Sequence, residues 1–133
     1  MDVFKLYATD EDLEVAGVEV ELSGGAFITV GRENNDNYLV RINEEGLKHQ
    51  EALNAGGPSA RELDRKVTAG VLAETVFLGM RGIKLNDVYV EDTYENRVKL
   101  LSKGFKDFRR LVMAEARKID HFRAKAEAKD LKD

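Results

Sequence analysis

The sequence contains no cysteine and no tryptophan, and Pro58 is its single proline. Without cysteine the chain can form neither disulfides nor thiolate metal sites, and it has no thiol nucleophile. Its most apolar stretch, residues 67–80, is interrupted by Gly70, Glu74 and Gly79. No run therefore approaches the roughly 18–20 apolar residues that a membrane-spanning helix needs, and we expect no membrane as a partner.

The first residues, 1–5, lack a basic segment followed by an apolar one, so we expect no secretory signal. The chain has 133 residues, of which 43% are hydrophobic and 35% are charged. This composition is typical of a globular protein rather than a disordered one. A chain of this length usually forms one domain and buries roughly two thirds of its unfolded surface.

Recognisable catalytic and ligand-binding motifs are missing. His49 and His121 are the only histidines, and neither belongs to an H-E-x-x-H pattern. The acidic residues 10–14 lack the central glycine and terminal glutamate of a calcium loop. The glycine pairs at 24–25 and 56–57 fit turns rather than phosphate-binding loops. We therefore expect no catalytic residues, no metal and no cofactor, and a protein that is not an enzyme.

The net charge of −4 is unevenly distributed along the chain. Residues 1–58 contain 4 Lys and Arg against 12 Asp and Glu, whereas residues 59–133 contain 17 against 13. This asymmetry would favour head-to-tail self-association or a charged partner, although an ordinary solvated surface explains it equally well. The C-terminal half is too mixed in sign to predict binding to nucleic acid.

Residues 18–30 carry the pattern of a β-hairpin. Apolar residues alternate with glutamates over residues 18–22, and residues 26–30 are rich in β-branched and aromatic side chains. Between them, residues 23–25 tolerate the positive φ angles of a tight turn. Residues 3–7 predict a further short strand. A lone hairpin is marginal in water, so its apolar face must pack on the helices downstream.

Two helices are predicted in the middle of the chain. The first covers residues 36–54 and follows several asparagines suited to N-capping. The second covers residues 59–80, opens with a capping box formed by Ser59 and Glu62, and is terminated by Gly79 and Gly82. Because the second helix is the most apolar segment of the chain, we expect it to occupy the centre of the core.

The remaining residues predict an extended connection over 83–91, with a turn at residues 86–87. Thr93 is expected to cap the next helix. Residues 105–128 then show the 3.6-residue period of a long amphipathic helix. Beyond Phe122 large apolar side chains become scarce, so the end of this helix should fray unless a partner binds it.

Together these patterns predict an α+β fold. An N-terminal β-hairpin or small antiparallel sheet packs on three to four α-helices, and the C-terminal half is mostly helical. We expect a single domain over residues 1–133, with a β-rich part at 1–33, a helical part at 34–128 and a frayed tail at 129–133.

Large apolar residues recur at helical spacing near the C-terminus. Such a stripe usually belongs to the core, but it can also form a ridge that binds a partner helix. An exposed ridge would favour aggregation unless self-assembly or a client covered it. The candidate partner-binding residues are Phe105, Phe108, Leu111, Val112 and Phe122.

Several short motifs follow each other in a fixed order along the chain. They are Arg32 to Tyr38 after the hairpin, Ala73-Glu74-Thr75 to Gly79, Gly82-Ile83, Thr93-Tyr94-Glu95-Asn96, Val98 to Leu101, Phe108 to Val112, and Phe122. These motifs resemble those of the tail assembly chaperones of long-tailed bacteriophages. The resemblance covers residues 26–128, with Met80 where the family usually has Trp and Tyr94 where Pro is common.

This resemblance implies a phage or prophage protein without enzymatic activity. Members of the family coat the long, helical and aggregation-prone tape measure protein in the host cytoplasm before the tail tube polymerises. The resemblance also implies self-association into a homo-oligomer, and contact with the tail tube protein through a longer frameshifted form. Such a chaperone is not expected in the mature virion. The alternative is a structural virion protein, such as a tail-completion or head–tail connector subunit.

Overall fold

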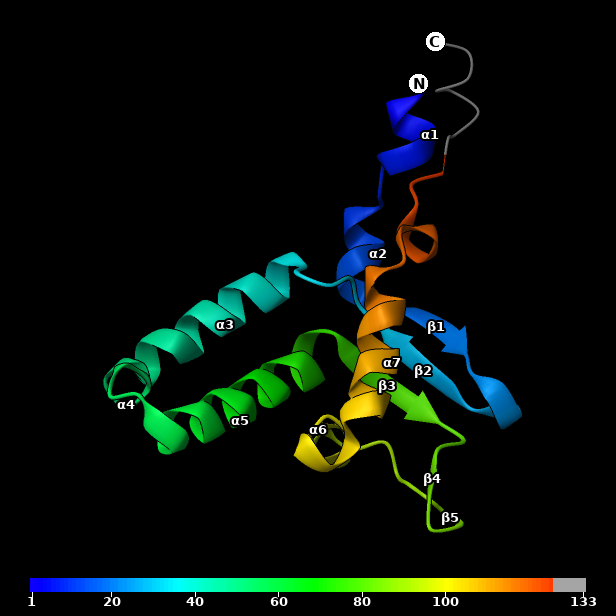
Figure 1. Ribbon diagram of the computed structural model, residues 1–133. Coiled ribbons are helices and arrows are strands. Elements are labelled where there is room, and N and C mark those ends of the chain that lie inside the picture. The colour runs from blue at the N-terminus through cyan, green and yellow to red at the C-terminus, as the bar shows by residue number, and fades with distance from the viewer. Residues whose placement is uncertain (126–133) are drawn as a thin grey trace.

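The structure, a computed structural model, describes residues 1–125 of the chain. The predicted α+β fold is confirmed, because helices pack on a small antiparallel sheet (Figure 1). The sequence's expectation of a frayed tail at residues 129–133 lies outside the described residues. The strands of the sheet are β1 (Val18–Glu21), β2 (Phe27–Val30) and β3 (Phe77–Arg81), in the order β1-β2-β3.

The predicted hairpin is confirmed as β1 and β2. The register pairs Val18 with Val30, so the alternating apolar residues of the two strands share one face. The turn is a short 3₁₀ segment, η1 (Ser23–Gly25), in which Gly24 and Gly25 have φ angles of 72° and 76°. A side chain disfavours these left-handed angles, which explains the glycine pair.

A helical pair extends away from the sheet (Figure 1). It consists of α3 (Asp36–Lys48), the short α4 (Gln50–Asn54) and α5 (Gly57–Thr75). The helix expected at 36–54 is therefore present with a break at His49. The expected start at Ser59 is wrong: α5 begins at Gly57 with Pro58 in its first turn, where a missing N–H costs nothing.

The prediction that this helix continues to residue 80 is also wrong. The helix ends at Thr75, and the chain turns at Val76 into β3, which pairs with β2. The Val76 carbonyl accepts a hydrogen bond from Gly31 N–H at 2.8 Å, which fixes this turn. A β-branched and aromatic run fits a buried strand as well as a helix, and here the pairing with β2 decides its conformation.

After β3 the chain forms a two-stranded hairpin, which confirms the predicted turn at residues 86–87. Thr93 caps the next helix as predicted, because its hydroxyl accepts from Asn96 N–H at 3.1 Å. The elements are β4 (Lys84–Leu85), β5 (Val88–Tyr89), α6 (Tyr94–Leu100), η2 (Lys103–Phe105), α7 (Lys106–Arg117) and η3 (Ile119–Phe122).

The long helix expected over residues 105–128 is wrong in its C-terminal part. Helix α7 ends at Arg117, and Lys118 has an extended backbone. The chain then folds back as η3, which places Phe122 in the core. Burial of this large ring outweighs the continuation of a mostly polar helix. Residues 126–128 of the expected helix lie outside the part that the structure describes.

The N-terminal segment is helical, so the predicted strand at residues 3–7 is wrong. It forms α1 (Val3–Tyr7) and then α2 (Glu11–Ala16). Side chains of Asp2 and Asp10 cap these helices by accepting from the N–H groups of Lys5 and Leu13, both at 3.1 Å. Within residues 1–125 no strand pairs with residues 3–7.

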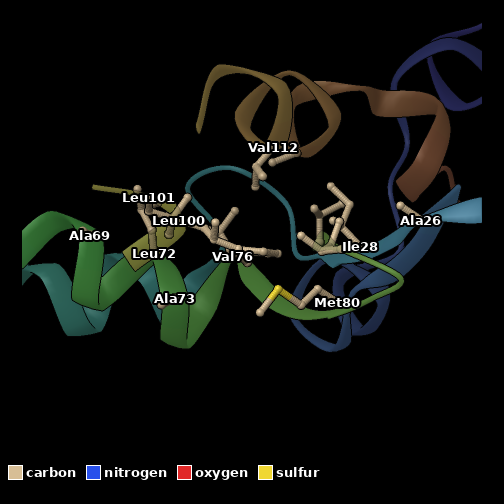
Figure 2. Close-up of a cluster of buried hydrophobic side chains, with 14 of the residues drawn as sticks. Ala26, Ile28, Ala69, Leu72, Ala73, Val76, Met80, Leu100, Leu101 and Val112 are labelled. Atoms are coloured by element: carbon tan, nitrogen blue, oxygen red, sulfur yellow. The ribbon is translucent and has the colours of Figure 1, made fainter. Parts of the chain in front are cut away.

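The core lies between the sheet, the C-terminal half of α5 and α7. In Figure 2, Val112 of α7 lies above Ile28 of β2 and Val76, while Leu72 and Leu101 fill the end toward the helical pair. Ile28, Val112 and Phe122 have no exposed surface. Within residues 1–125, no helix combines the length and the hydropathy that spanning a membrane requires.

Candidate functional site

The five candidate partner-binding residues do not form one exposed ridge. Val112 and Phe122 are fully buried, and Phe105 and Phe108 are half-buried against the core. Leu111 alone among the five is exposed, with 39% of its surface accessible. The sequence left open whether these residues are core or ridge. Burial places Val112 and Phe122 in the core, so a partner cannot reach them in this conformation.

A groove runs instead along the adjacent face of α7. It lies between α7, the first turn of α3 and the middle of α5, and its cavity volume is about 440 Å³. The accessible apolar side chains of its lining are Tyr38 from α3 and Met113 from α7, and its floor is formed by the buried Leu72 of α5 and Leu101 after α6. The groove therefore offers side chains from several helices to one ligand.

Cationic side chains surround this apolar lining. Among the described residues that line the groove, the single carboxylate is Glu33, which pairs with Arg117. Arg110 pairs with Asp107 at 2.9 Å, but both side chains are highly exposed, so the pair is weak. The cations along the groove are Arg65, Lys103, Lys106, Arg109, Arg110 and Arg117.

Three of these cations are available for an anionic partner. In residues 1–125, no carboxylate lies within salt-bridge distance of Lys103, Lys106 or Arg109. Arg109 lies near Tyr38, since its charge lowers the pKa of that hydroxyl while burial, the larger effect, raises it. Within residues 1–125 the chain therefore pairs three of the six cations, since Arg65 also lies 3.6 Å from Glu62, and the other three contribute an uncompensated positive field.

The helical repeat of α7 explains why the core and the groove share this helix. Phe108, Val112 and Ala116 follow each other at four-residue spacing and contact the core. Lys106, Arg110, Met113 and Arg117 also repeat every three to four residues, but on the neighbouring face. One amphipathic helix thus packs on the sheet with one face and lines the groove with the next.

The opposite wall of the groove is anchored by Asn35, which is buried. Its side-chain amide donates to the Arg32 carbonyl at 2.9 Å and to the Thr75 carbonyl at 2.8 Å. Its side-chain oxygen accepts from Tyr38 N–H at 3.0 Å and so caps α3. Asn35 therefore joins the start of α3 to the end of α5, on which the groove is built.

A second hollow lies between α3, α5 and the start of α6, and its two carboxylates, Glu45 and Glu74, are paired with Arg41. Arg41 donates to Glu44 at 2.6 Å, to Glu45 at 3.0 Å and to Glu74 at 2.9 Å. These bonds hold the pKa of Glu45 below its usual range. Within the described part of the chain no group of His, Asp and Glu side chains could hold a metal ion. This hollow is best explained as a bracing contact between α3 and α5.

Sequence reasoning missed the groove. Four of its six cations lie within residues 103–110, in η2 and α7, and the other two are Arg65 of α5 and Arg117. Sequence reasoning used only the general excess of Lys and Arg after residue 58. That excess gave the sign of a charged surface but not its position.

Comparison with known proteins gives a family for the chain. Residues 33–133 match a family described as YdaY prophage protein, and the match includes every element that lines the groove. No curated protein and no solved structure matches the chain. The match confirms the prophage origin that the sequence motifs implied. Because it covers most of the sequence, the chain belongs to the YdaY prophage protein family.

Proposed function

We propose that this prophage protein is a tail assembly chaperone without enzymatic activity. In this role it binds the tape measure protein in the host cytoplasm and keeps it soluble until the tail tube polymerises. The observation that carries the proposal is the groove along α7, with its apolar lining and cationic rim. It suits an amphipathic helix that lays an apolar stripe on the lining and places carboxylates at the rim.

The chemistry of the groove also fits a client that must later be released. Its rim consists of solvent-accessible Lys and Arg side chains, and exposed ion pairs contribute only about 0–1 kcal/mol each. One groove therefore binds one helical turn weakly. A long helical client offers many such turns, so several copies hold it by avidity and leave one at a time.

Co-expression with the tape measure protein of the same prophage tests this proposal. Affinity capture of the tape measure protein, followed by mass determination, should recover several copies of this chain on a soluble client. The groove variant Lys106→Glu with Arg110→Glu should lose capture, because both side chains line the groove and are exposed. The matched control is Lys48→Glu with Lys66→Glu, which reverses two exposed charges of α3 and α5 outside the groove.

The outcomes separate the proposed function from its alternative. Client solubility that depends on the groove charges but not on the control charges supports the chaperone. An insoluble client with nothing captured overturns it. A structural virion protein, in contrast, would remain in purified phage particles in stoichiometric amounts, which mass spectrometry of the particles detects.

A further inference from the structure

We propose that the groove of one copy also takes the N-terminal arm of a second copy. The arm consists of residues 1–14, which contain α1 and the first turn of α2. The contact does not rest on the proposed function, since it requires only copies of this chain. An arm and the tape measure protein would compete for the same groove. Three observations lead to it: the arm exposes apolar side chains, its backbone is fixed in place, and its charge complements that of the groove.

The first observation is that α1 leaves its apolar side chains uncovered. None of its residues is buried, although four of its five side chains are apolar or aromatic. A five-residue helix is too short to be stable alone in water, so its apolar surface implies a contact surface. The exposed fractions are 63% for Val3, 48% for Phe4, 44% for Leu6 and 59% for Tyr7.

The second observation is that the arm is held by its backbone. The Arg123 guanidinium donates to the carbonyls of Lys5 and Leu6, at 2.7 and 2.5 Å. Asp10 N–H donates to the Phe122 carbonyl at 2.8 Å, and Thr9 forms a β-bridge with Arg123. These bonds present the arm in one orientation while its side chains stay exposed, which lowers the entropic cost of docking.

The third observation is charge complementarity. Five carboxylates and one lysine give the arm a strongly negative charge, and Glu11 and Asp12 are exposed. The groove presents six cations and one carboxylate around its apolar lining. Apolar side chains followed by carboxylates on the arm thus match an apolar lining surrounded by cations in the groove. Opposite fields of this kind accelerate docking and fix its register.

The positions of the two surfaces require two copies. Figure 1 shows α1 beyond α2, at the opposite end of the molecule from α6 and away from the pair formed by α3 and α5. The groove lies between that pair and α7. An arm placed in a groove therefore joins two molecules through different surfaces. Such a head-to-tail contact leaves one arm and one groove free, and it repeats into a chain or closes into a ring.

A charge-swap experiment on the full chain tests the contact. The arm variant carries Glu11→Lys and Asp12→Lys, and the groove variant carries Lys106→Glu and Arg110→Glu. Sedimentation velocity at low ionic strength measures association, because surface charges are least screened there. We expect the wild type to associate with rising concentration, and each variant alone to associate at least about tenfold more weakly. An equimolar mixture of the two variants should associate again into heterodimers, since the unchanged arm of the groove variant then meets the unchanged groove of the arm variant.

The mixture also controls for misfolding, because two unfolded variants could not restore association. Phe4→Ser should weaken association of the wild-type chain, whereas Leu47→Ser, an exposed apolar residue of α3 outside the groove, should not. A wild type that stays monomeric would overturn the proposal, as would a mixture that remains monomeric. Association that disappears on nuclease treatment would place nucleic acid in the groove, and it would also overturn the proposal.

Discussion

The ring of Phe108 on α7 meets the ring of Phe77 on β3 edge to face, with centroids 5.9 Å apart and an interplanar angle of 63°. Phe77 has no exposed surface, whereas Phe108 lies at the boundary of the core. Together with the buried Val112 and Ala116, this pair helps to fix how α7 lies on the sheet. Because the next face of α7 lines the groove, the position of the groove's wall depends on it.

A double-mutant cycle on this pair should show coupling. Phe77→Ala should lower the free energy of unfolding by about 3–5 kcal/mol, as expected for a buried phenylalanine. Phe108→Ala should cost less, because its ring is only half-buried. The coupling energy should be about 0.5–1.5 kcal/mol, measured by urea denaturation of the four proteins. If the double mutant loses the sum of the two single-mutant free energies, the rings do not interact.

The candidate residues near the C-terminus should divide into two classes. Leu111→Glu should change the free energy of unfolding by no more than about 0.5 kcal/mol, since Leu111 is exposed. Phe122→Ala should cost about 3–5 kcal/mol, because it empties a fully buried site. Thermal and urea denaturation distinguish them. A Leu111→Glu protein that fails to fold would contradict its placement at the surface.

The substitution Asn35→Asp should lower the free energy of unfolding, although aspartate is a good N-cap for a helix. Asn35→Asp keeps the acceptor for Tyr38 N–H but loses both donors, and a carboxylate then faces the carbonyls of Arg32 and Thr75. We expect a loss of about 2 kcal/mol or more in urea denaturation at neutral pH.

The matched control for Asn35 is Thr93→Asp. The Thr93 hydroxyl accepts one hydrogen bond, from Asn96 N–H at 3.1 Å, and within residues 1–125 it donates none that the substitution would remove. The free energy of unfolding should therefore change by less than about 0.5 kcal/mol. Equal losses of unfolding free energy in Asn35→Asp and Thr93→Asp would show that the two hydrogen bonds donated by Asn35 contribute little to stability.

The carboxyl of Glu115 should make the free energy of unfolding depend on pH. Burial alone would raise the pKa of its carboxyl, but hydrogen bonds from Lys118 and His121 outweigh burial and leave the pKa below its ordinary value. A lowered pKa stabilises the fold above the unfolded-state pKa of about 4.3, and the contribution disappears as pH falls through the folded-state pKa.

The comparison is between the wild type and Glu115→Gln. Their difference in free energy of unfolding should be larger near about pH 5 than near about pH 3, because protonation removes the charge that the variant lacks. Urea denaturation at both pH values measures it. A difference that does not change with pH would mean that the ion pairs of Glu115 with Lys118 and His121 are not formed in solution.

Local chemistry made part of the fold predictable. The alternation over residues 18–22 and the glycine pair that follows define the hairpin without help from the rest of the chain. Likewise the cap at Thr93 and the turn at residues 86–87 depend on side chains within a few positions. Such signals are readable because cause and effect are adjacent in the sequence.

Two of the errors occurred where distant residues decide the conformation. Residues 77–80 continue the apolar run of the helix, yet they form a strand because β2, about fifty residues earlier, offers a free edge. The chain leaves the helix at Arg117 because Phe122 finds a buried site that no local pattern reveals. The groove escaped prediction for the same reason, since its lining comes from helices far apart in sequence.

The place of Phe122 in the core bears on how the chain is synthesised. Ile28 on β2 belongs to the same buried cluster as Phe122 and Val112, and β3 completes the sheet beside β2. During translation the apolar face of the first hairpin therefore lacks the cover of Val112 and Phe122 until some ninety further residues have been synthesised (Ile28 to Phe122). A truncation between β3 and α7 would release a chain with this face exposed, and a ribosome pause there would prolong the exposure. In both cases the chain becomes a target for host proteases and general chaperones.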